Sequence, residues 1–519
     1  MAVQKIFTAT LIGIEAALVE VEADVSNGLP TTIIVGLPDT AVQESRERVR
    51  LAIKHSGFQY PQTRVSLNLA PGGLPKVGTH FDLPIALAIL LASGILRTTT
   101  ELNKTLFVGE LSLDGSIKTT AGVLAMVQLA KQRGFNSVFV PNENVLMASL
   151  VDGINVYGLN SLSELTQHLQ GKPQGQKQIE SAPSYRNIKV PVISDFDFAE
   201  IAGQQHAKRA LEIAAAGGHN ILLTGPPGSG KTMLAKALAS IMPPLEKEEM
   251  LELTKIYNSS GKLNSGIITR RPFRSPHHTA SSIALIGGGG VPRPGEVTLA
   301  HHGVLFLDEF PEFSRASLEV LRQPLEDNSI TITRARHAYT FPASFILVAA
   351  QNPCPCGNFG QSLNDAKLEC KCHPTAIQRY KKKISGPLLD RIDLHITVPR
   401  LAYKEISGAT PAQDKNSNNK KIETSAEIQQ RVTAARAIQT HRFGKSQTNH
   451  EMTSQQLKQF CALTQDSEQF LEQAADTYQL SGRTIHRVQK VARTIADLEK
   501  SKNIELSHLA ESLQYRLRD

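Results

Sequence analysis

The sequence predicts a multidomain α/β protein with a doubly wound parallel sheet in its middle and a helical domain at its end. First, the 519 residues of the chain correspond to roughly two to four domains of ordinary size. Second, short runs of β-forming residues alternate with helical patterns through the first two predicted domains, as is typical of α/β folds. Third, almost the whole chain after Thr424 has the periodicity of helices.

Two polar stretches set the predicted domain boundaries. Residues 169–190 are rich in Pro, Gly and Gln, and residues 401–423 contain an Asp-Lys-Asn-Ser-Asn-Asn-Lys-Lys run. Neither stretch has the periodicity of a helix or a strand, so we interpret both as linkers. The three predicted domains are therefore residues 1–168, 191–400 and 424–519.

The composition is that of a globular protein with a mild excess of basic residues. Apolar residues make up 41% of the chain, and 56 basic against 48 acidic residues give a net charge of +8. This charge permits contact with nucleic acid but does not require it. No apolar run approaches the roughly 20 residues that cross a bilayer, and the N-terminus lacks the apolar core of a signal peptide. We therefore expect a cytoplasmic protein without membrane contact.

The first domain is predicted to be an α/β or α+β sandwich. Its predicted strands are Thr32–Val35, Arg64–Leu69, Leu106–Val108 and Ser137–Val140. Helical patterns near residues 40–56, 82–94 and 121–133 lie between these strands. Such alternation is typical of helices that cover a sheet.

The second domain contains a glycine-rich loop between a buried strand and a helix. The strand is Asn220–Thr224, and the helix begins after the loop. The loop consists of Gly225, Pro226, Pro227, Gly228, Ser229, Gly230, Lys231 and Thr232. In this context the pattern indicates a P-loop, whose backbone N–H groups and helix N-terminus hold the phosphates of ATP. We expect Lys231 to reach the β- and γ-phosphates and Thr232 to place its hydroxyl on Mg²⁺.

Polar residues follow two further strands of this domain. Gly303–Leu307 is a buried strand that ends in Asp308 and Glu309, and Ser344–Ala350 is another that precedes Asn352. Asp308 is predicted to hold Mg²⁺, and Glu309 to activate the attacking water. Asn352 is predicted to orient that water against the γ-phosphate.

Residues 191–400 resemble the AAA+ ATPases of the magnesium-chelatase branch. The resemblance is carried by the P-loop and by Ile201–Gln205, Gly287–Val297, His302–Glu309 and Leu388–Leu394. The whole chain resembles the ComM/YifB group, in which a Lon-protease-like N-terminal domain precedes this ATPase and a helical lid follows it.

This resemblance implies roles for two arginines. Arg391, in Leu-Leu-Asp-Arg-Ile-Asp, matches the arginine finger, which acts on the ATP of the neighbouring subunit. Arg483, in Leu-Ser-Gly-Arg-Thr-Ile-His, matches the sensor-2 position of the lid. An arginine that acts between subunits requires a ring, so the resemblance implies a homo-hexamer.

Four cysteines form two close pairs in a polar insert, residues 354–372. They are Cys354, Cys356, Cys370 and Cys372. Four thiolates suit a tetrahedral Zn²⁺ site, and a metal would stabilise a loop without an apolar core. Four reduced thiols or a redox disulfide are the alternatives. His373 is a further candidate ligand, whereas Cys461 lies in a helical pattern and is expected in a core.

The first domain resembles the Lon-type protease domain through Gly73–Ala86 and Val108–Ile117. An active member pairs a serine nucleophile with a lysine base. In an approximate alignment the serine position falls near His80 and the lysine position near Leu124. Neither residue performs that chemistry, so we predict a non-proteolytic domain that serves ring assembly or DNA contact.

Three functions are then open for the ATP hydrolysis. The ComM resemblance implies a hexameric DNA motor, a helicase that promotes branch migration in natural transformation or homologous recombination. In that case the basic stretches Arg379–Lys383 and Arg334–Tyr339 are candidate contacts to single-stranded or branched DNA. Gly287–Gly290 and Ile330–Tyr339 are candidate pore loops. A metal-insertion chaperone like magnesium chelatase and an ATP-dependent protease are the alternatives.

Overall fold

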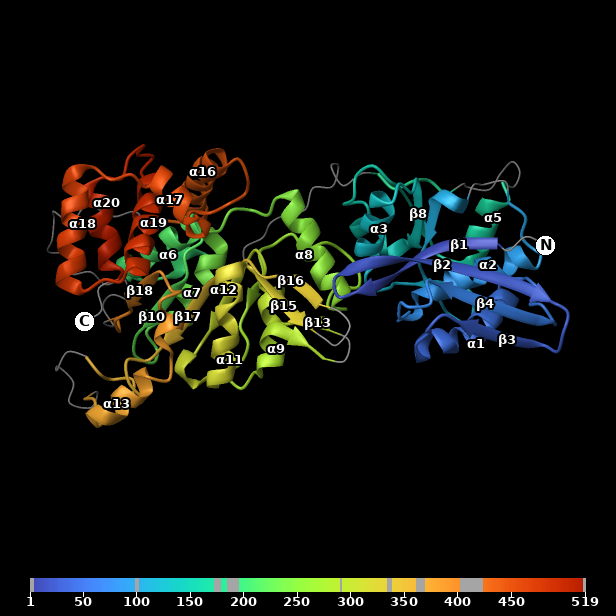
Figure 1. The fold of residues 1–519 in the computed structure, drawn as a ribbon, viewed down its shortest axis with the longest axis horizontal. Coiled ribbons are helices and arrows are strands. Elements are labelled where there is room, and N and C mark those ends of the chain that lie inside the picture. Colours follow the sequence, from blue (N-terminus) through green and yellow to red (C-terminus); the bar gives the residue numbers. More distant parts are fainter. Residues whose placement is uncertain are drawn as a thin grey trace. The chain divides into compact units, whose positions relative to one another are not determined.

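The computed structural model describes residues 4–98, 102–171, 179–183, 196–289, 292–333, 338–360, 369–401 and 423–516. The chain forms two compact units (Figure 1). Unit 1 comprises Met1–Pro191, Glu246–Thr269 and Gly290–Pro294, and unit 2 comprises Val192–Leu245, Arg270–Gly289 and Gly295–Asp519. Most of the two predicted linkers lies outside the described residues.

Unit 1 is built on a seven-stranded sheet. Its strands are β1 (Gln4–Ile12), β2 (Glu15–Ser26), β3 (Thr31–Val35), β4 (Arg64–Ala70), β5 (Thr105–Phe107), β8 (Ser137–Pro141) and β9 (Asn155–Leu159). The order across the sheet is β3-β4-β2-β1-β5-β8-β9. β2 pairs antiparallel with β1 and β4, and the other neighbours are parallel. A small antiparallel ribbon joins β6 (Glu110–Leu111) to β7 (Ile117–Lys118).

The helices of unit 1 pack against this sheet. They are α1 (Thr40–His55), α2 (Asp82–Ala92), α3 (Val123–Gln132), α4 (Val145–Ala148), α5 (Leu162–Leu169) and α8 (Lys247–Ser259). The four predicted strands and three predicted helices of this region are confirmed, with small differences at their ends. The apolar run Leu83–Leu91 belongs to α2, a core helix.

Helix α8 belongs to unit 1, although the sequence places it after the P-loop. Lys247 Nζ lies 2.5 Å from Asp152 Oδ2, and Lys255 Nζ lies 2.7 Å from Glu15 Oε1. Leu251 packs against an apolar core of unit 1. This assignment differs from the predicted boundaries because side-chain contacts, rather than the order of residues, decide where α8 packs.

Unit 2 is built on a five-stranded sheet in which every pair of neighbours is parallel. Its strands are β10 (Ile221–Thr224), β11 (Phe273–Arg274), β14 (Val304–Leu307), β17 (Ile346–Gln351) and β18 (Leu394–Thr397). The order is β11-β14-β17-β10-β18. The predicted parallel sheet is thereby confirmed, and β10, β14 and β17 are the three strands that precede the predicted site residues.

The other elements of the central segment are short helices and strands. The helices are α6 (Gln205–Gly217), α7 (Lys231–Ile241), α9 (Ser282–Ile286), α10 (Glu296–Leu299), α11 (Arg315–Glu319), α12 (Pro324–Asp327), α13 (Pro374–Lys381) and α14 (Gly386–Leu389). The strands are β12 (Gly287–Gly288), β13 (Arg293–Pro294), β15 (Ser329–Thr333) and β16 (Ala338–Pro342). β15 and β16 form an antiparallel hairpin.

Helices cover both faces of the parallel sheet. Ile221 and Leu223 of β10 lie in an apolar cluster with residues of α6 and α7, whereas Leu222 lies in another cluster with residues of α9 to α12. Successive residues of a strand point to opposite faces. The sheet is therefore buried on both sides, as a doubly wound fold requires.

The described chain after residue 423 is helical, as predicted. Its helices are α16 (Ser425–Phe443), α17 (Ser454–Phe460), α18 (Gln465–Tyr478), α19 (Gly482–Leu498) and α20 (Leu506–Gln514). α16 begins at a capping box between Thr424 and Glu427 and ends at Gly444 in the left-handed region. Cys461 is buried in a core of these helices, as expected.

In the ranges that the structure describes, no helix is long and apolar enough to cross a membrane.

Candidate nucleotide-binding site

The predicted P-loop connects the end of β10 to the start of α7. Gly228 and Gly230 have φ angles of 76° and 89°, a conformation that residues with a side chain rarely adopt. A Cβ on either glycine would meet no atom within 4 Å. Their conformation, not a lack of space, therefore requires glycine.

Lys231 is the first residue of α7 and lies across the mouth of the loop. Its Nζ donates to Gly225 O at 2.7 Å, to Pro226 O at 2.9 Å and to Asn352 Oδ1 at 3.3 Å. Burial lowers the pKa of Lys231, and the nearby Asp308 partly offsets this effect. The structure thus brings together Lys231 and Asn352, which the sequence separates widely.

Thr232 and Asp308 meet beside this lysine. Thr232 Oγ1 donates to Asp308 Oδ2 at 3.2 Å, and Asp308 follows the last residue of β14. A hydroxyl and a carboxylate at this distance are the oxygen ligands that Mg²⁺ takes beside a bound nucleotide. The donor set therefore fits the predicted magnesium.

Glu309 has an unusual backbone and an unpredicted partner. Its φ of 50° and ψ of 42° lie in the left-handed region, which is uncommon for a residue with a side chain and clusters at functional sites. Its Oε2 lies 3.1 Å from Nδ1 of His278. The sequence analysis missed His278, because the histidine follows β11, a two-residue strand whose pairing with β14 only the fold reveals.

These side chains line one cavity of about 400 Å³. Its lining residues are Pro227, Gly228, Ser229, Gly230, Lys231, Thr232, Met233, Asp308, Glu309, Gln351 and Asn352. The hydroxyl of Ser229 is buried and has no hydrogen-bond partner in the described part of the chain, although buried polar groups are normally paired. An anionic phosphate would supply that partner, so the residues present fit ATP.

The two predicted arginines lie in a different cavity of unit 2. Arg391 and Arg483 line a space of about 410 Å³ together with Arg487 and Lys490. Arg391 is only 5% exposed, and its guanidinium pairs with Glu326. Arg483 is exposed. The structure therefore places the two predicted arginines together and apart from the P-loop of the same chain.

A buried carboxylate organises this second cavity. Asp393 Oδ2 lies 3.0 Å from His219 Nδ1 and 2.6 Å from His450 Nδ1, and Asp393 Oδ1 accepts from Arg487. Burial alone would raise the pKa of Asp393, but the adjacent His450 and Arg487 hold it well below its usual range. This network joins the segment after Arg391 to α19, and no periodic pattern in the sequence predicts it.

Replacement of Asp393 by asparagine is expected to lower the free energy of unfolding by about 3–5 kcal/mol at pH 7, because Arg487 loses its buried partner. A carboxyl whose pKa falls on folding stabilises the fold above its unfolded pKa, and this effect is lost as the pH falls through the folded pKa. The difference in the free energy of unfolding between wild type and Asp393→Asn should therefore shrink below pH ~4. Chemical denaturation measures it, with Asp390→Asn as the control. An unchanged midpoint for Asp393→Asn would contradict the role of the network.

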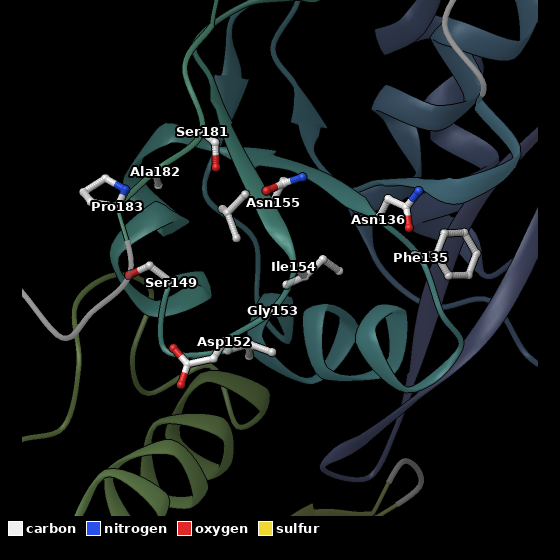
Figure 2. Close-up of a pocket in the computed structure, with 12 residues that line it drawn as sticks. Phe135, Asn136, Ser149, Asp152, Gly153, Ile154, Asn155, Ser181, Ala182 and Pro183 are labelled. Atoms are coloured by element: carbon white, nitrogen blue, oxygen red, sulfur yellow. The ribbon is translucent and has the colours of Figure 1, made fainter.

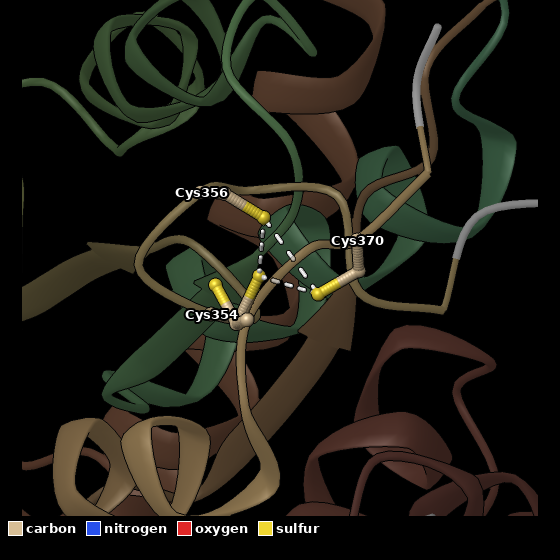
Figure 3. Close-up of side chains that lie close together, drawn as sticks. Cys354, Cys356 and Cys370 are labelled. Carbon is tan, nitrogen blue, oxygen red and sulfur yellow. Dashed lines mark hydrogen bonds between the residues drawn. The ribbon is translucent and has the colours of Figure 1, made fainter. Parts of the chain in front are cut away.

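The four predicted cysteines lie close together, and Figure 3 shows three of them, Cys354, Cys356 and Cys370, with their sulfurs turned toward one another. The Sγ atom of Cys354 lies 3.3 Å from that of Cys356 and 3.7 Å from that of Cys370, and Cys356 Sγ lies 3.7 Å from Cys370 Sγ. All four sulfurs, including that of Cys372, lie within 4.8 Å of one another. A hydrogen bond from the backbone of Asn358 lowers the pKa of the Cys356 thiol to about 6.

The further candidate ligand, His373, has a different role. Its Nδ1 accepts a hydrogen bond from the backbone N–H of Thr375 at 3.4 Å and caps the N-terminus of α13. Among the described residues, the metal-ligand cluster at this place consists of the four cysteines alone. Residues 361–368 of the insert lie outside the described residues.

The positions assigned to a protease dyad in unit 1 are both buried. His80 is 4% exposed, and its Nε2 lies 2.8 Å from Ala9 O. Burial lowers the pKa of His80 to about 4. Leu124 is fully buried in an apolar core. Neither position presents a nucleophile or a base to a substrate.

A larger cavity, of about 520 Å³, lies in unit 1 at the edge strand β9. Ser181 and Asp152 lie at opposite sides of it (Figure 2). Its charged side chain, Asp152, is paired with Lys247. We place the site at the smaller cavity because chemistry needs converging charged and polar groups, which the larger cavity lacks.

Three family models match the chain. The model described as magnesium chelatase, subunit ChlI, matches residues 197–406. The model of subunit ChlI of Mg-chelatase matches residues 21–144, and the model of the ChlI C-terminal region matches residues 422–516. The matched ranges cover most of the described residues of both units.

Relatives match along the full length. Competence protein ComM of Haemophilus influenzae is 42% identical over 521 residues, which cover 99% of this chain and 98% of ComM. The protein YifB of Escherichia coli is 40% identical over 523 residues, which cover 100% of this chain and 98% of YifB. Lon protease 2 of Bacillus subtilis is more distant, 26% identical over 36% of each chain. The chain therefore belongs to the ComM/YifB family of magnesium-chelatase-like AAA+ ATPases.

Proposed function

We propose that the chain is the subunit of a homo-hexameric, ATP-driven DNA motor that acts in natural transformation or homologous recombination. The observation that carries this proposal is the separation of two half-sites in unit 2. Lys231, Thr232, Asp308 and Asn352 line one cavity, whereas Arg391 lines another. A ring of identical subunits brings the first half-site of one subunit to the second half-site of its neighbour.

In the first half-site, each residue has a task that its position supports. The P-loop backbone and Lys231 bind the phosphates, and Asn352, which accepts from Lys231, holds the attacking water in line. Glu309 removes the proton of that water once it turns from His278. A magnesium ion held by Thr232 and Asp308 supplies positive charge for the phosphates.

In the second half-site, the arginines supply the charge that the first half-site lacks. We propose that Arg391 acts as a finger on the ATP of the neighbouring subunit, and that Arg483 reaches the same ATP from the C-terminal helices as a lid. Because Arg391 is paired with Glu326 in the single subunit, assembly must exchange this partner for phosphate. Hydrolysis would then depend on the ring.

DNA is the proposed substrate of the motor because of the relative's name and of a basic surface. Competence protein ComM is named for competence, the uptake state of transformation. Arg379, Lys381 and Lys382 on and after α13 are exposed, and Lys381 Nζ lies 5.8 Å above the ring of the exposed Phe359. Exposed cations beside an aromatic ring suit a single strand.

The hairpin β15–β16 is a second proposed contact. The predicted segment Ile330–Tyr339 includes most of β15 and the start of β16, and residues 334–337 lie outside the described residues. We propose that it acts as a pore loop, and that the Gly287–Gly290 segment, described up to residue 289, assists it.

The test is ATP hydrolysis and branch migration on a mobile three- or four-way DNA junction. Wild-type protein should hydrolyse ATP faster with DNA, with a salt-sensitive stimulation. Glu309→Gln should lower the hydrolysis rate by about 10²-fold or more and stop branch migration, because the base is lost. Glu472→Gln, at an exposed acid of α18, is the control and should leave hydrolysis and branch migration unchanged.

Two outcomes would favour other functions. If single strands, forks and four-way junctions all leave the hydrolysis rate unchanged, the DNA motor is wrong, and the magnesium-chelatase models favour a metal-insertion chaperone. If casein is digested with ATP, the proposed non-proteolytic role of unit 1 is wrong. We expect no digestion, because His80 and Leu124 are buried.

A further inference from the structure

The cysteine cluster begins immediately after the residue that orients water in the proposed ATP site. β17 ends at Gln351, Asn352 follows, and Cys354 is two residues further on. Asn352 contacts Lys231 at 3.3 Å, and the side chain of Cys354 is fully buried. Only Pro353 separates Cys354 from Asn352, so the position of Cys354 constrains that of Asn352.

The same cluster touches the P-loop through its first turn. Gly357 N donates to Cys354 O at 3.0 Å, and Gly357 has a φ of 85°. A Cβ on Gly357 would lie 2.4 Å from Cδ of Pro227. No side chain therefore fits at position 357. The backbone of this turn packs directly against the ring of Pro227 in the P-loop.

The second pair of cysteines reaches Asn352 through α13, which starts two residues after Cys372. Tyr380 of this helix is buried, and its phenol lies near the backbone of Asn352. Asn352 thus accepts a hydrogen bond from Lys231 of the P-loop and lies beside Tyr380 of the helix that follows the cluster.

The sulfur positions fit one tetrahedral zinc ion. Zn–S bonds of about 2.3 Å place the sulfurs of a tetrahedron about 3.8 Å apart. The separations among Cys354, Cys356 and Cys370 are 3.3 to 3.7 Å, and the sulfur of Cys372 lies within 4.8 Å of each of them. A disulfide needs about 2.05 Å. We propose that the four cysteines bind zinc, and that this metal site holds Asn352 and Pro227 in the geometry that ATP hydrolysis requires.

This role is positional, since the cysteines do not line the nucleotide cavity. The proposal rests on the proposed ATPase activity and not on DNA. Metal binding and nucleotide binding would then favour each other, because each orders the loop that the other contacts, and such coupling is reciprocal.

The first test compares substitutions at two neighbouring residues, Cys370 and Lys371, of the second cysteine pair. Protein purified without chelators should contain one zinc per chain. Cys370→Ser should lose that zinc and lower kcat by about 10²-fold, the size of effect that a small misplacement of a positioning group produces. Lys371→Ser, at the exposed residue between the two cysteines, should keep both zinc and kcat.

The second test keeps every ligand in place. Gly357→Ala should lower kcat while zinc content stays at one per chain, because its methyl group meets Pro227. Gly360→Ala has the same left-handed strain, with a φ of 78°, but its Cβ would meet nothing within 4 Å. Gly360→Ala should leave kcat unchanged. Comparison of the two variants therefore distinguishes an effect of the contact with Pro227 from an effect of backbone strain or misfolding.

The third test reads zinc rather than activity. A non-hydrolysable ATP analogue should slow the extraction of zinc by a chromogenic chelator in wild-type protein, but not in Gly357→Ala. Absence of stoichiometric zinc would overturn the metal site. Zinc loss in Cys370→Ser with unchanged kcat would overturn the coupling. A zinc-containing wild-type protein that never hydrolyses ATP would instead contradict the proposed function.

Discussion

Replacement of Lys231 by alanine is expected to reduce ATP hydrolysis by at least about 10³-fold, the loss that follows removal of a preorganised charge at a transferring phosphoryl group. Lys231 Nζ is held by Gly225 O and Pro226 O at the mouth of the loop. Its position is therefore fixed before nucleotide arrives. Steady-state phosphate release measures the effect.

The fold should survive this substitution. Lys231 forms no ion pair among the described residues, and its burial lowers its pKa. The buried ammonium therefore does not stabilise the fold, and its removal should not unfold the protein. Lys236→Ala, one turn and a half further along the exposed face of α7, is the control and should hydrolyse ATP normally. Unchanged turnover in Lys231→Ala would refute the assignment of the P-loop.

The parallel sheet and the first half-site were predictable because their signals are local. Buried strands such as Val304–Leu307 are continuous apolar runs. Asp308 and Asn352 follow β14 and β17, and Lys231 follows β10 after the glycine-rich loop. The carboxyl ends of parallel strands meet at one edge. The positions of the three strand ends were therefore enough to predict that Lys231, Asp308 and Asn352 lie in one site.

Other features depend on contacts that no local pattern reveals. The hairpin of β1 and β2 was not predicted, although Val19 and Val21 alternate with Glu20 and Glu22 as a half-buried strand requires. The packing of α8 in unit 1 involves contacts over a long sequence separation, such as those of Leu251 with an apolar core and of Lys255 with Glu15. Such partners are identified only by the fold.

The partners of the site residues were the least predictable part. His278 lies beside Glu309 only because β11 and β14 are neighbours. The pairing of Arg391 with Glu326 shows that a motif locates a residue without revealing its state in a single subunit. The motif implied an arginine that acts on a neighbour, whereas the structure of one chain buries it.

Replacement of Arg391 by alanine is expected to lower ATP hydrolysis by about 10³–10⁵-fold, the contribution of an arginine finger. Glu326→Gln is the matched control, because it breaks the same ion pair and leaves the finger in place. If the ion pair matters only for folding, both variants lose activity together. If Arg391 is the finger, Glu326→Gln keeps its ATPase activity and only Arg391→Ala loses it.

Mixing two inactive variants shows whether Arg391 acts between subunits. Arg391→Ala retains an intact P-loop, and Lys231→Ala retains an intact finger. In rings assembled from an equal mixture, about one quarter of the interfaces pair an intact P-loop with an intact finger. Hydrolysis should therefore recover to about a quarter of the wild-type rate if the sites work independently. No recovery in mixed rings would mean that Arg391 serves its own chain, and the two cavities of unit 2 would then belong to different tasks.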